Sequence, residues 1–490
     1  MSDDGLVLVT GATGYIGGRL VPELLDAGYK VRALARHPER LDDRDWRDRV
    51  EVVQADASEA DDLRAAMAGV DVAYYLIHAL GTGSRFESRD RQTARAFGVA
   101  ARQAGVRRIV YLGGLYPADE QLSPHLDSRR EVGEILLASG VPTTVLRAAV
   151  ILGSGSASFE MLRYLTERLP VMVAPKWLKN RIQPIAVRDV LRYLVGSASM
   201  PAEVNRGFDI GGPDVLTYQD MMQRYAAVAR LPRRQVMPVP VLTPSLSGHW
   251  VGLVTPVPNG IARPLVESLI HEVVCKEHDI ARYVPDPDGG LLGFDDAVEQ
   301  ALRRVREGDV EVAPAGEAGD QLPSDPQPGD PEWAGGSLYA EELTTAVDAD
   351  PAVLWSVIEG IGGERGWYGT TWVWAARGLL DRAVGGPGLR KGRRDPDRLA
   401  VGDQLDFWRV EAVEPGRLLR LRAEMKLPGQ AWLELRVTDG KLVQRTLFYP
   451  HGLAGQAYWW AAKPLHALES RRLQAGIAAT AAAAAGGNGG

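Results

Sequence analysis

Apolar residues follow two spacings in the first third of the chain, one typical of buried strands and one typical of helices. The run Leu6–Val9 has the length and β-branched content of a buried strand. After Thr10-Gly11 the spacing becomes helical, with apolar positions at Tyr15, Ile16, Leu20, Leu24 and Leu25. Further along, the pattern predicts strands over Lys30–Ala35, Val50–Ala55 and Val70–Ile77, and a short helix over Asp61–Met67. This alternation predicts an α/β fold with a doubly wound parallel sheet.

The last third of the chain has a different pattern. Asp350–Ile358 predicts a capped helix with one apolar face. Four strand-like runs follow, separated by turns that contain Pro-Gly or Asp-Gly: Leu405–Val413, Leu418–Met425, Trp432–Val437 and Leu442–Tyr449. Apolar and polar residues alternate in the third run, as in a sheet with one covered face. A final helix, interrupted at Pro464, completes an α+β pattern of short helix, antiparallel sheet and closing helix.

A segment of distinct composition lies between the two regions that show these patterns. Residues 308–336 contain no basic residue, and their prolines and glycines alternate with acidic residues. Such a segment buries too little apolar surface to order itself, so we expect a flexible acidic linker. The domains expected are therefore residues 1–307 and 337–477, and the second contains eight of the 12 tryptophans. The Ala/Gly-rich residues 478–490 predict a frayed tail.

Three glycines, Gly11, Gly14 and Gly17, fall between the first strand and its helix. Without Cβ atoms they allow a tight bend, close approach of a pyrophosphate, and close packing of helix on strand. The free N–H groups and the positive end of the helix would then face the phosphates. Because a strand precedes this motif and an amphipathic helix follows it, the motif predicts a dinucleotide-binding site.

Two strand ends carry candidate contacts to the nucleotide. Arg36 follows the second strand, where an acidic residue would accept hydrogen bonds from the ribose of NAD and an arginine suits the 2′-phosphate of NADP. The alternative is an arginine that is simply solvated. Asp56 follows the third strand, where a carboxylate can accept a hydrogen bond from the adenine amino group.

Four motifs resemble the atypical short-chain dehydrogenase/reductases with extended or NmrA-like Rossmann domains: Thr10–Gly17, Asp56-Ala57, Arg147–Ala149 and Gln183–Val190. The resemblance covers about Leu6–Val305 and is most specific in the glycine motif. It implies a Rossmann domain with a substrate-side lobe that binds NADP, with NAD as the alternative. The nucleotide contacts that it implies are Thr10, Gly11, Thr13, Gly14, Tyr15, Ile16, Gly17, Arg36, Asp56, Ala57, Ile77, His78 and Arg147.

The sequence departs from that family at the catalytic positions. Active members carry a Tyr-x-x-x-Lys pair on the helix after the fifth strand, and a serine or threonine directly after that strand. Here the strand Arg108–Leu112 is followed by Gly113-Gly114, and the pair is replaced by His125 and Arg129. A histidine could act as an acid or base near neutral pH, whereas an arginine could hold a ribose or phosphate without exchanging protons. The alternative is a site that binds nucleotide and lacks the standard chemistry.

Four further motifs, at Gly388–Pro396, Gly402-Asp403, Asp406–Val410 and Tyr458–His466, resemble the uncharacterised DUF2867 domain. The order of elements resembles the START/Bet v 1-like helix-grip fold, which implies a cavity for a hydrophobic or amphipathic molecule. A basic loop with Arg390, Lys391, Arg393 and Arg394 either holds an anionic head group or is solvated. Three roles are open for the triplet Tyr458-Trp459-Trp460: it lines the cavity, it rests on a membrane surface, or it packs against the sheet.

Charge and cysteine content narrow the function classes. The formal net charge of −7 argues against a general nucleic-acid binder. Cys275 is the single cysteine, which excludes an internal disulfide and fits a reducing compartment. His271, Cys275 and His278 would share one helical face, but three ligands without a fourth make a weak site, so we expect no metal. The absence of a signal-like start or a long apolar run predicts a cytoplasmic protein without a transmembrane segment. The oligomeric state stays open.

Two functions follow from these patterns. One is an oxidoreductase or isomerase that acts on a bulky hydrophobic substrate, with His125 as the acid. The other is a non-catalytic protein that senses nucleotide or assists assembly, as in NmrA-like regulators. The missing Tyr/Lys pair favours the second function, and the linked ligand-binding domain favours the first.

Overall fold

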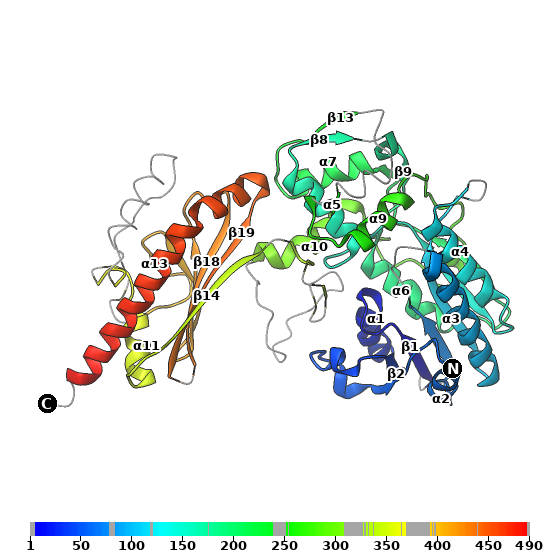
Figure 1. Ribbon diagram of the computed structural model, residues 1–490, viewed down its shortest axis with the longest axis horizontal. Helices are drawn as coiled ribbons and strands as arrows, with labels where there is room; N and C mark the ends of the chain where they lie inside the picture. Colours follow the sequence, from blue (N-terminus) through cyan, green and yellow to red (C-terminus); the bar gives the residue numbers. More distant parts are fainter. Residues whose placement is uncertain are drawn as a thin grey trace. The chain divides into compact units, whose positions relative to one another are not determined.

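The computed structural model describes residues 5–77, 84–117, 121–174, 176–238, 251–252, 254–307, 327, 330–331, 333–336, 338–363, 365–368, 393, 395, 398–438 and 440–487. The chain forms two compact units, Met1–Gly336 and Ser337–Gly490 (Figure 1).

The first unit is built on a seven-stranded sheet in the order β11-β6-β5-β4-β1-β2-β3. All six pairings are parallel, which confirms the expected doubly wound class. The strands are β1 (Leu6–Thr10), β2 (Lys30–Ala35), β3 (Glu51–Gln54), β4 (Val72–Tyr75), β5 (Arg108–Gly114), β6 (Thr143–Ala148) and β11 (Arg206–Ile210).

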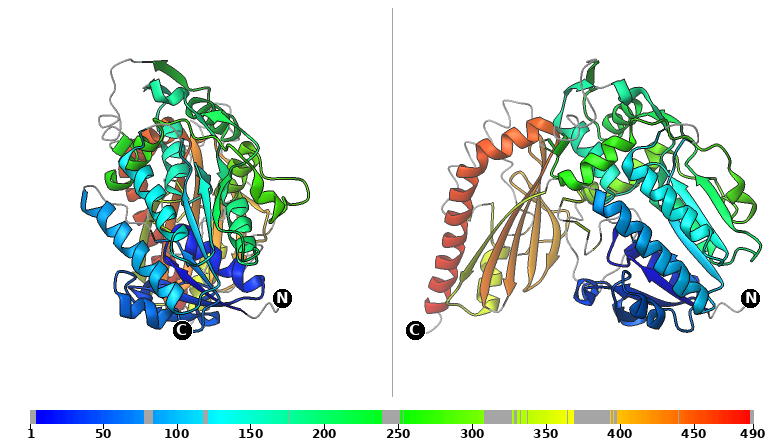
Figure 2. Two further views of the ribbon diagram at one scale, coloured as in Figure 1. Left: turned by 90° about the vertical axis from the view of Figure 1, so that its right-hand side faces the viewer. Right: turned by 45° about the vertical axis from the view of Figure 1, so that its right-hand side comes forward.

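Helices cover both faces of this sheet (Figures 1 and 2). They are α1 (Tyr15–Asp26), α2 (Ala60–Ala66), α3 (Ser84–Gln103), α4 (Pro124–Leu137) and α6 (Val187–Ser197). Alternate residues of a strand enter different cores: Val7 and Val9 pack with α1 and α6, and Leu8 packs with α2 and α3. Burial on both faces explains why the central strands are continuous apolar runs in the sequence.

A lobe with its own apolar core completes the first unit. Its helices are α5 (Ala157–Arg168), α7 (Tyr218–Val228), α9 (Asn259–Ser268) and α10 (Phe294–Glu307), and its short strands are β7 (Ile151–Leu152), β8 (Val171–Ala174), β9 (Arg181–Ile182), β10 (Ile185–Ala186), β12 (Leu216–Thr217) and β13 (Gln235–Pro238). The expected helical face of His271, Cys275 and His278 is wrong. Helix α9 ends at Ser268, and Val273 forms a bridge to Ile182 in extended backbone.

The second unit is a six-stranded antiparallel sheet with a long helix on one face (Figure 2). The elements are β14 (Tyr339–Ala346), α11 (Pro351–Glu359), β15 (Gln404–Leu405), β16 (Trp408–Glu414), β17 (Leu418–Ala423), β18 (Gly429–Thr438), β19 (Lys441–Pro450) and α13 (Gly452–Gly487). The strand order is β14-β19-β18-β17-β16-β15. The Asp350 carboxylate caps α11 by accepting a hydrogen bond from the Ala352 N–H at 2.8 Å.

Two features of this unit differ from the sequence-based expectation. Strand β14 was not expected from the sequence, because it is polar at several positions. In the structure its residues are alternately half-buried and exposed. The expected frayed tail is wrong as far as Gly487, because α13 continues through Pro464 and buries Ile477 and Ala481 completely. Alanine has the highest helix propensity, so this segment extends the helix while its apolar side packs on the core.

The acidic segment is also anchored at its C-terminal end. Asp330 forms a two-pronged ion pair with Arg19 of α1, with both N–O distances 2.7 Å and side-chain exposures of 6% and 1%. Tyr164 donates a hydrogen bond to the Trp333 carbonyl, and the Gly335 N–H donates to Glu160. The expectation that this segment buries too little to order itself is therefore wrong for its described residues, 327, 330–331 and 333–336, which contact α1 and α5 and are called the strap below.

Candidate functional site

The three glycines of the loop between β1 and α1 have different structural roles. Gly11 has a φ of +75°, and a Cβ there would lie 2.7 Å from the Leu76 carbonyl oxygen. A Cβ on Gly17 would lie 2.2 Å from the Gly11 carbonyl oxygen, so both positions require glycine for the fold itself. Gly14 is exposed, and a Cβ there would meet only the Gly11 oxygen at 3.2 Å. The fold therefore leaves open space at Gly14, where a ligand could approach the backbone.

The N-terminus of α1 is suited to an anion. Gly14 is the N-cap residue, it supplies no side-chain cap, and the first helical turn contains no acidic residue. The N–H groups of Tyr15, Ile16 and Gly17 belong to this first turn, which has no intrahelical acceptor for them. Their partial positive charge and the helix dipole favour a phosphate at this point.

Two residues of the expected nucleotide set have side chains that are used elsewhere. Thr10 is fully buried, and its hydroxyl donates to the Tyr74 carbonyl at 2.8 Å and accepts from the Leu76 N–H. The Thr10 hydroxyl thus links the end of β1 to the end of β4, and a nucleotide contact by Thr10 stays a prediction. The Tyr15 ring stacks under the Arg19 guanidinium at 4.0 Å, and burial raises the pKa of its phenol. Tyr15 can therefore offer a nucleotide only its backbone.

Charged side chains lie at the ends of β2 and β3. Arg36, directly after β2, is exposed, and its charge helps to lower the pKa of Asp56 below its usual range. The larger cause of that lowering is the Ser58 N–H, which donates to Asp56 Oδ1 at 2.9 Å. Arg89 of α3 also lowers the pKa of Asp56, so it lies within electrostatic reach of the same carboxylate. Arg89 was missed in the sequence, because nothing local marks one exposed arginine on a helix as part of a site.

The remaining members of the expected nucleotide set are less informative. Thr13, Ile16 and Ile77 are half-buried, and Ala57 is buried. His78 lies outside the described residues. Arg147 of β6 is held by Asp209 of β11 at 2.7 Å, and its guanidinium lies 5.7 Å from the centre of the Tyr116 ring. A nucleotide contact by Arg147 stays a prediction.

Helix α4, which carries His125 and Arg129, is poorly suited to proton transfer. His125 is 7% exposed, and burial, with a smaller effect from Arg129, lowers its pKa from 6.5 to about 3. Burial therefore favours the neutral imidazole, which is a poor acid, and a catalytic role for His125 stays a prediction. Arg129 donates to the Leu112 carbonyl at 3.3 Å, which ties it to the end of β5.

Burial determines the protonation state of the single cysteine. Burial raises the pKa of the Cys275 thiol to about 12, so it is protonated and unreactive at neutral pH. In the part of the chain that the structure describes, no cluster of three potential ligands could hold a metal ion. Over the same residues, no helix combines the length and the apolar character that crossing a bilayer requires.

Models of two known families match this chain, one for each unit. A family model described as NAD(P)H-binding matches residues 11–162. A second model, described as a protein of unknown function (DUF2867), matches residues 333–472.

Individual relatives are named as reductases. The chain is 30% identical over 236 residues to the (4-alkanoyl-5-oxo-2,5-dihydrofuran-3-yl)methyl phosphate reductase of Streptomyces griseus subsp. griseus, which covers 47% of this chain and 76% of that protein. It is 29% identical over 316 residues to the ceramide reductase of Caulobacter vibrioides, which covers 60% of this chain and 94% of that protein. Among solved structures, the triphenylmethane reductase of Citrobacter sp. complexed with NADP(H) is 20% identical with a TM-score of 0.48, and covers 60% of this chain and 99% of that chain.

Proposed function

This chain belongs to the NAD(P)H-binding Rossmann proteins of the NmrA-like, short-chain dehydrogenase/reductase type, and we propose that it is an NADP(H)-dependent reductase of a hydrophobic or amphipathic substrate. The observation that carries the proposal is the uncapped N-terminus of α1, built on exposed Gly14, with Arg36 at the end of the neighbouring strand. This arrangement matches the two anionic parts of NADP(H), the pyrophosphate and the 2′-phosphate.

Each part of the site has a separate task in this proposal. The N–H groups of Tyr15, Ile16 and Gly17 hold the pyrophosphate, and Arg36 pairs with the 2′-phosphate through charge-assisted hydrogen bonds. Arg89 adds positive charge on the other side of Asp56. When bound, the nicotinamide cofactor supplies a hydride to an electron-poor carbon.

The residues of α4 restrict which substrates can be reduced. With His125 neutral and Arg129 unable to exchange protons, this helix supplies no acid to a developing alkoxide. Reduction of a simple ketone needs such an acid. A conjugated double bond does not, because the hydride adds to the far carbon and the resulting enolate takes its proton from water. The site therefore favours α,β-unsaturated carbonyl substrates over isolated ketones.

The named relatives support the substrate class. One is named as the reductase of an alkanoyl-substituted dihydrofuranone phosphate and another as a ceramide reductase, and both names describe molecules with an alkyl chain. By analogy we propose that this chain also acts on a carbonyl compound with a long apolar group.

One observation favours a second function. The same buried, neutral His125 and the glycines at 113 and 114 suit a protein that binds nucleotide without turnover. In that case the first unit would report the NADP(H) level to a partner.

A single series separates these functions. The full chain is titrated with NADPH by calorimetry and then assayed for NADPH consumption with an alkyl-substituted unsaturated lactone and with its saturated ketone counterpart. We expect binding, consumption with the lactone only, and neither in Gly14→Val. NADPH binding without consumption on any substrate supports the sensing function, and absence of NADPH binding contradicts both.

A further inference from the structure

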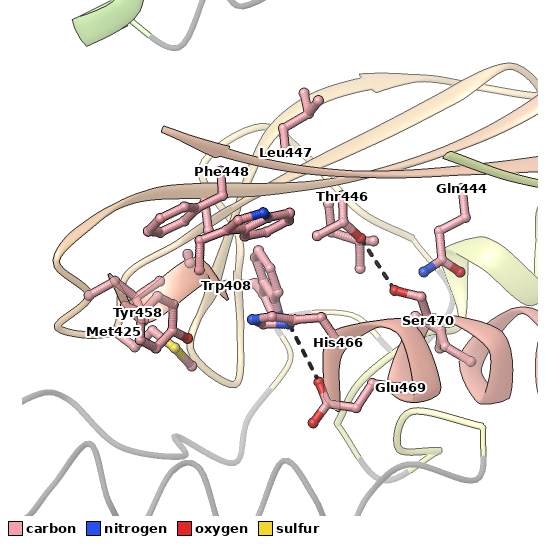
Figure 3. Close-up of a pocket in the computed structure, with 16 residues that line it drawn as sticks. Trp408, Met425, Gln444, Thr446, Leu447, Phe448, Tyr458, His466, Glu469 and Ser470 are labelled. Carbon is pink, nitrogen blue, oxygen red and sulfur yellow. Dashed lines mark hydrogen bonds and ion pairs between the residues drawn. The ribbon is translucent and has the colours of Figure 1, made fainter. Parts of the chain in front are cut away.

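The inward face of α13 packs against the sheet of the second unit, and Figure 3 shows the side chains between them. Trp459 is 3% exposed and lies parallel to Phe448 of β19, with ring centres 5.5 Å apart and planes at 6°. The space that remains there is about 50 Å³, which is enough for water and too small for a lipid-sized molecule. Binding of a hydrophobic molecule inside this unit stays a prediction.

The outward face of α13 is apolar, although the solvent side of a surface helix is ordinarily polar. Between Leu453 and Leu468, every exposed residue is apolar except Lys463. We call these apolar residues the α13 strip: Leu453, Ala454, Ala457, Trp460, Ala461, Pro464, Leu465 and Leu468. Leu453 is 49% exposed, and Leu465 and Leu468 are each 45% exposed. A contiguous exposed apolar surface marks a site of interaction.

The triplet Tyr458-Trp459-Trp460 divides between the two faces of the helix. Trp459 packs against the sheet, whereas Trp460 is 61% exposed and belongs to the strip. The Trp460 ring meets Tyr339 edge-on at 5.9 Å, and Lys463 Nζ lies 5.3 Å from its centre. Tryptophan is enriched where water meets lipid, because its ring is apolar and its N–H can still find a polar partner.

The exposed charges of α13 are all positive. Lys463 lies beside Trp460, and Arg471 and Arg472 are exposed directly after the end of the strip. Glu469 is the single acidic residue of the helix, and it is 3% exposed. The chain as a whole has a formal net charge of −7, so this cationic helix opposes the overall balance. Its charges complement an anionic surface.

The basic loop of the second unit does not enter this charge pattern. The Arg393 guanidinium donates to the carbonyls of Asp395 and Ile361, and these bonds hold its own loop. Arg390, Lys391 and Arg394 lie outside the described residues. Binding of an anionic head group by this loop stays a prediction.

Shape and charge favour a lipid surface over a second copy of the chain. The strip runs for about 23 Å along one helix, at 1.5 Å per residue, and a single helix presents a convex surface that a fluid bilayer can cover. Lys463 lies near the middle of the strip, so a two-fold pairing of two strips would place it opposite its own counterpart. Like charges at such a contact oppose association.

We propose that the α13 strip docks the second unit on the surface of an anionic lipid bilayer. The apolar side chains of the strip enter the boundary between head groups and acyl chains, while Lys463, Arg471 and Arg472 meet the lipid phosphates. The helix lies on the bilayer and does not cross it. The proposal goes beyond the reductase function and is independent of it, since no nucleotide group takes part.

Co-sedimentation of the full chain with vesicles tests the proposal. One set of vesicles is pure phosphatidylcholine, and the other contains about one third phosphatidylglycerol. At low salt we expect binding to the anionic vesicles to be roughly tenfold tighter or more, because each cation near an anionic surface favours binding. High salt should reduce this preference. No binding to the anionic vesicles, or equal binding to both sets, overturns the proposal.

Two variant pairs locate the contact. Trp460→Ala should weaken binding to the anionic vesicles by roughly tenfold, whereas Val401→Ala, at a residue of the same unit that is 68% exposed, should not. The double variant Arg471→Gln with Arg472→Gln should reduce the preference for anionic vesicles, whereas Lys441→Gln, at an exposed lysine of β19, should leave it unchanged. All of these side chains are exposed, so the variants should fold. Equal binding by Trp460→Ala and Val401→Ala overturns the assignment to the strip.

Sedimentation velocity without lipid tests the competing occupant. A dimer that becomes monomeric in Trp460→Ala, together with a wild type that binds no vesicles, overturns the proposal in favour of contact between two copies. Gly14→Val, which should lose NADPH binding, should bind the anionic vesicles as the wild type does. Failure of the reductase proposal is therefore distinguishable from failure of this one.

Discussion

The nucleotide site of the first unit and the α13 strip of the second unit are built in opposite ways. The first is a candidate backbone site: Gly14 leaves open space where N–H groups of α1 can meet an anion, and Gly11 and Gly17 allow the loop to fold. The second is a candidate side-chain site: it consists of exposed apolar side chains between Leu453 and Leu468 on one helix. A backbone site that depends on glycine is blocked by any added side chain. A site formed by many side chains loses only part of its function when one of them is removed.

The largest expected effect comes from adding a side chain at Gly17. A Cβ there would lie 2.2 Å from the Gly11 carbonyl oxygen. That oxygen belongs to the backbone and the Cβ position is fixed by the backbone of α1, so the clash can be relieved only by displacing α1 from β1. We expect Gly17→Val to lower the free energy of unfolding by more than about 4 kcal/mol, or to prevent folding, as seen in urea denaturation.

Gly14→Val is the matched control for that experiment. Its Cβ has no contact closer than 3.2 Å, so the free energy of unfolding should change by less than about 1 kcal/mol. NADPH binding should nevertheless be lost, because the valine fills the space of the pyrophosphate. NADPH binding that survives in Gly14→Val would mean that the loop is purely structural.

The strap belongs to the first unit, but unlike the glycine loop it is held in place by side chains. Asp330→Asn removes the carboxylate that pairs with the buried Arg19 guanidinium. We expect the free energy of unfolding to fall by about 3–5 kcal/mol, measured by denaturation of the full chain. Asp325→Asn, a change in the same acidic segment, serves as the comparison. A loss of less than about 1 kcal/mol would show that the strap adds nothing to the first unit.

His125 gives a pH dependence with a fixed sign. Its pKa is about 3 in the folded protein and 6.5 ordinarily, so between these values the unfolded chain binds a proton that the folded chain does not. Stability should therefore fall as the pH falls through this window, by up to about 1.4 kcal/mol per pH unit. His125→Gln should flatten the slope of unfolding free energy against pH, and His37→Gln, at an exposed histidine, should not. An identical slope in His125→Gln and the wild type would contradict the burial effect.

The parts of this molecule that sequence predicts well are those with local causes. The bounds of β2 agree to the residue, because its apolar positions Val31, Ala33, Leu34 and Ala35 are all buried and are visible in the sequence. Strand β14 and the strap at Asp330 were not predictable, since their contacts are to residues about 100 and 311 positions away. The alignment of His125 with the usual tyrosine position stays a prediction, and the low pKa of His125 depends on burial, which residue spacing does not report.

The candidate sites divide in the same way. Gly11, Gly14, Gly17 and Arg36 were predicted from their places in the sequence, because glycines mark a backbone site and a strand end marks its neighbour, and their contacts with nucleotide stay predictions. Arg89 was missed, since it acquires its surroundings only after folding. The prediction of a hydrophobic cavity in the second domain came from resemblance, and the packing that leaves about 50 Å³ there was not visible in the sequence.

The central claim is that the first unit recognises NADP(H) through Arg36 and the open end of α1. The most direct measurement is calorimetric titration of the wild type and Arg36→Ala with NADPH and NADH, with exposed Arg64→Ala as the control. We expect the wild type to bind NADPH about ten- to a hundredfold more tightly than NADH, because a charge-assisted pair contributes about 1.5–3 kcal/mol. Arg36→Ala should lose that difference while keeping its NADH affinity. Equal affinities for the two nucleotides in the wild type, or an equal loss of both in Arg36→Ala, would contradict the claim.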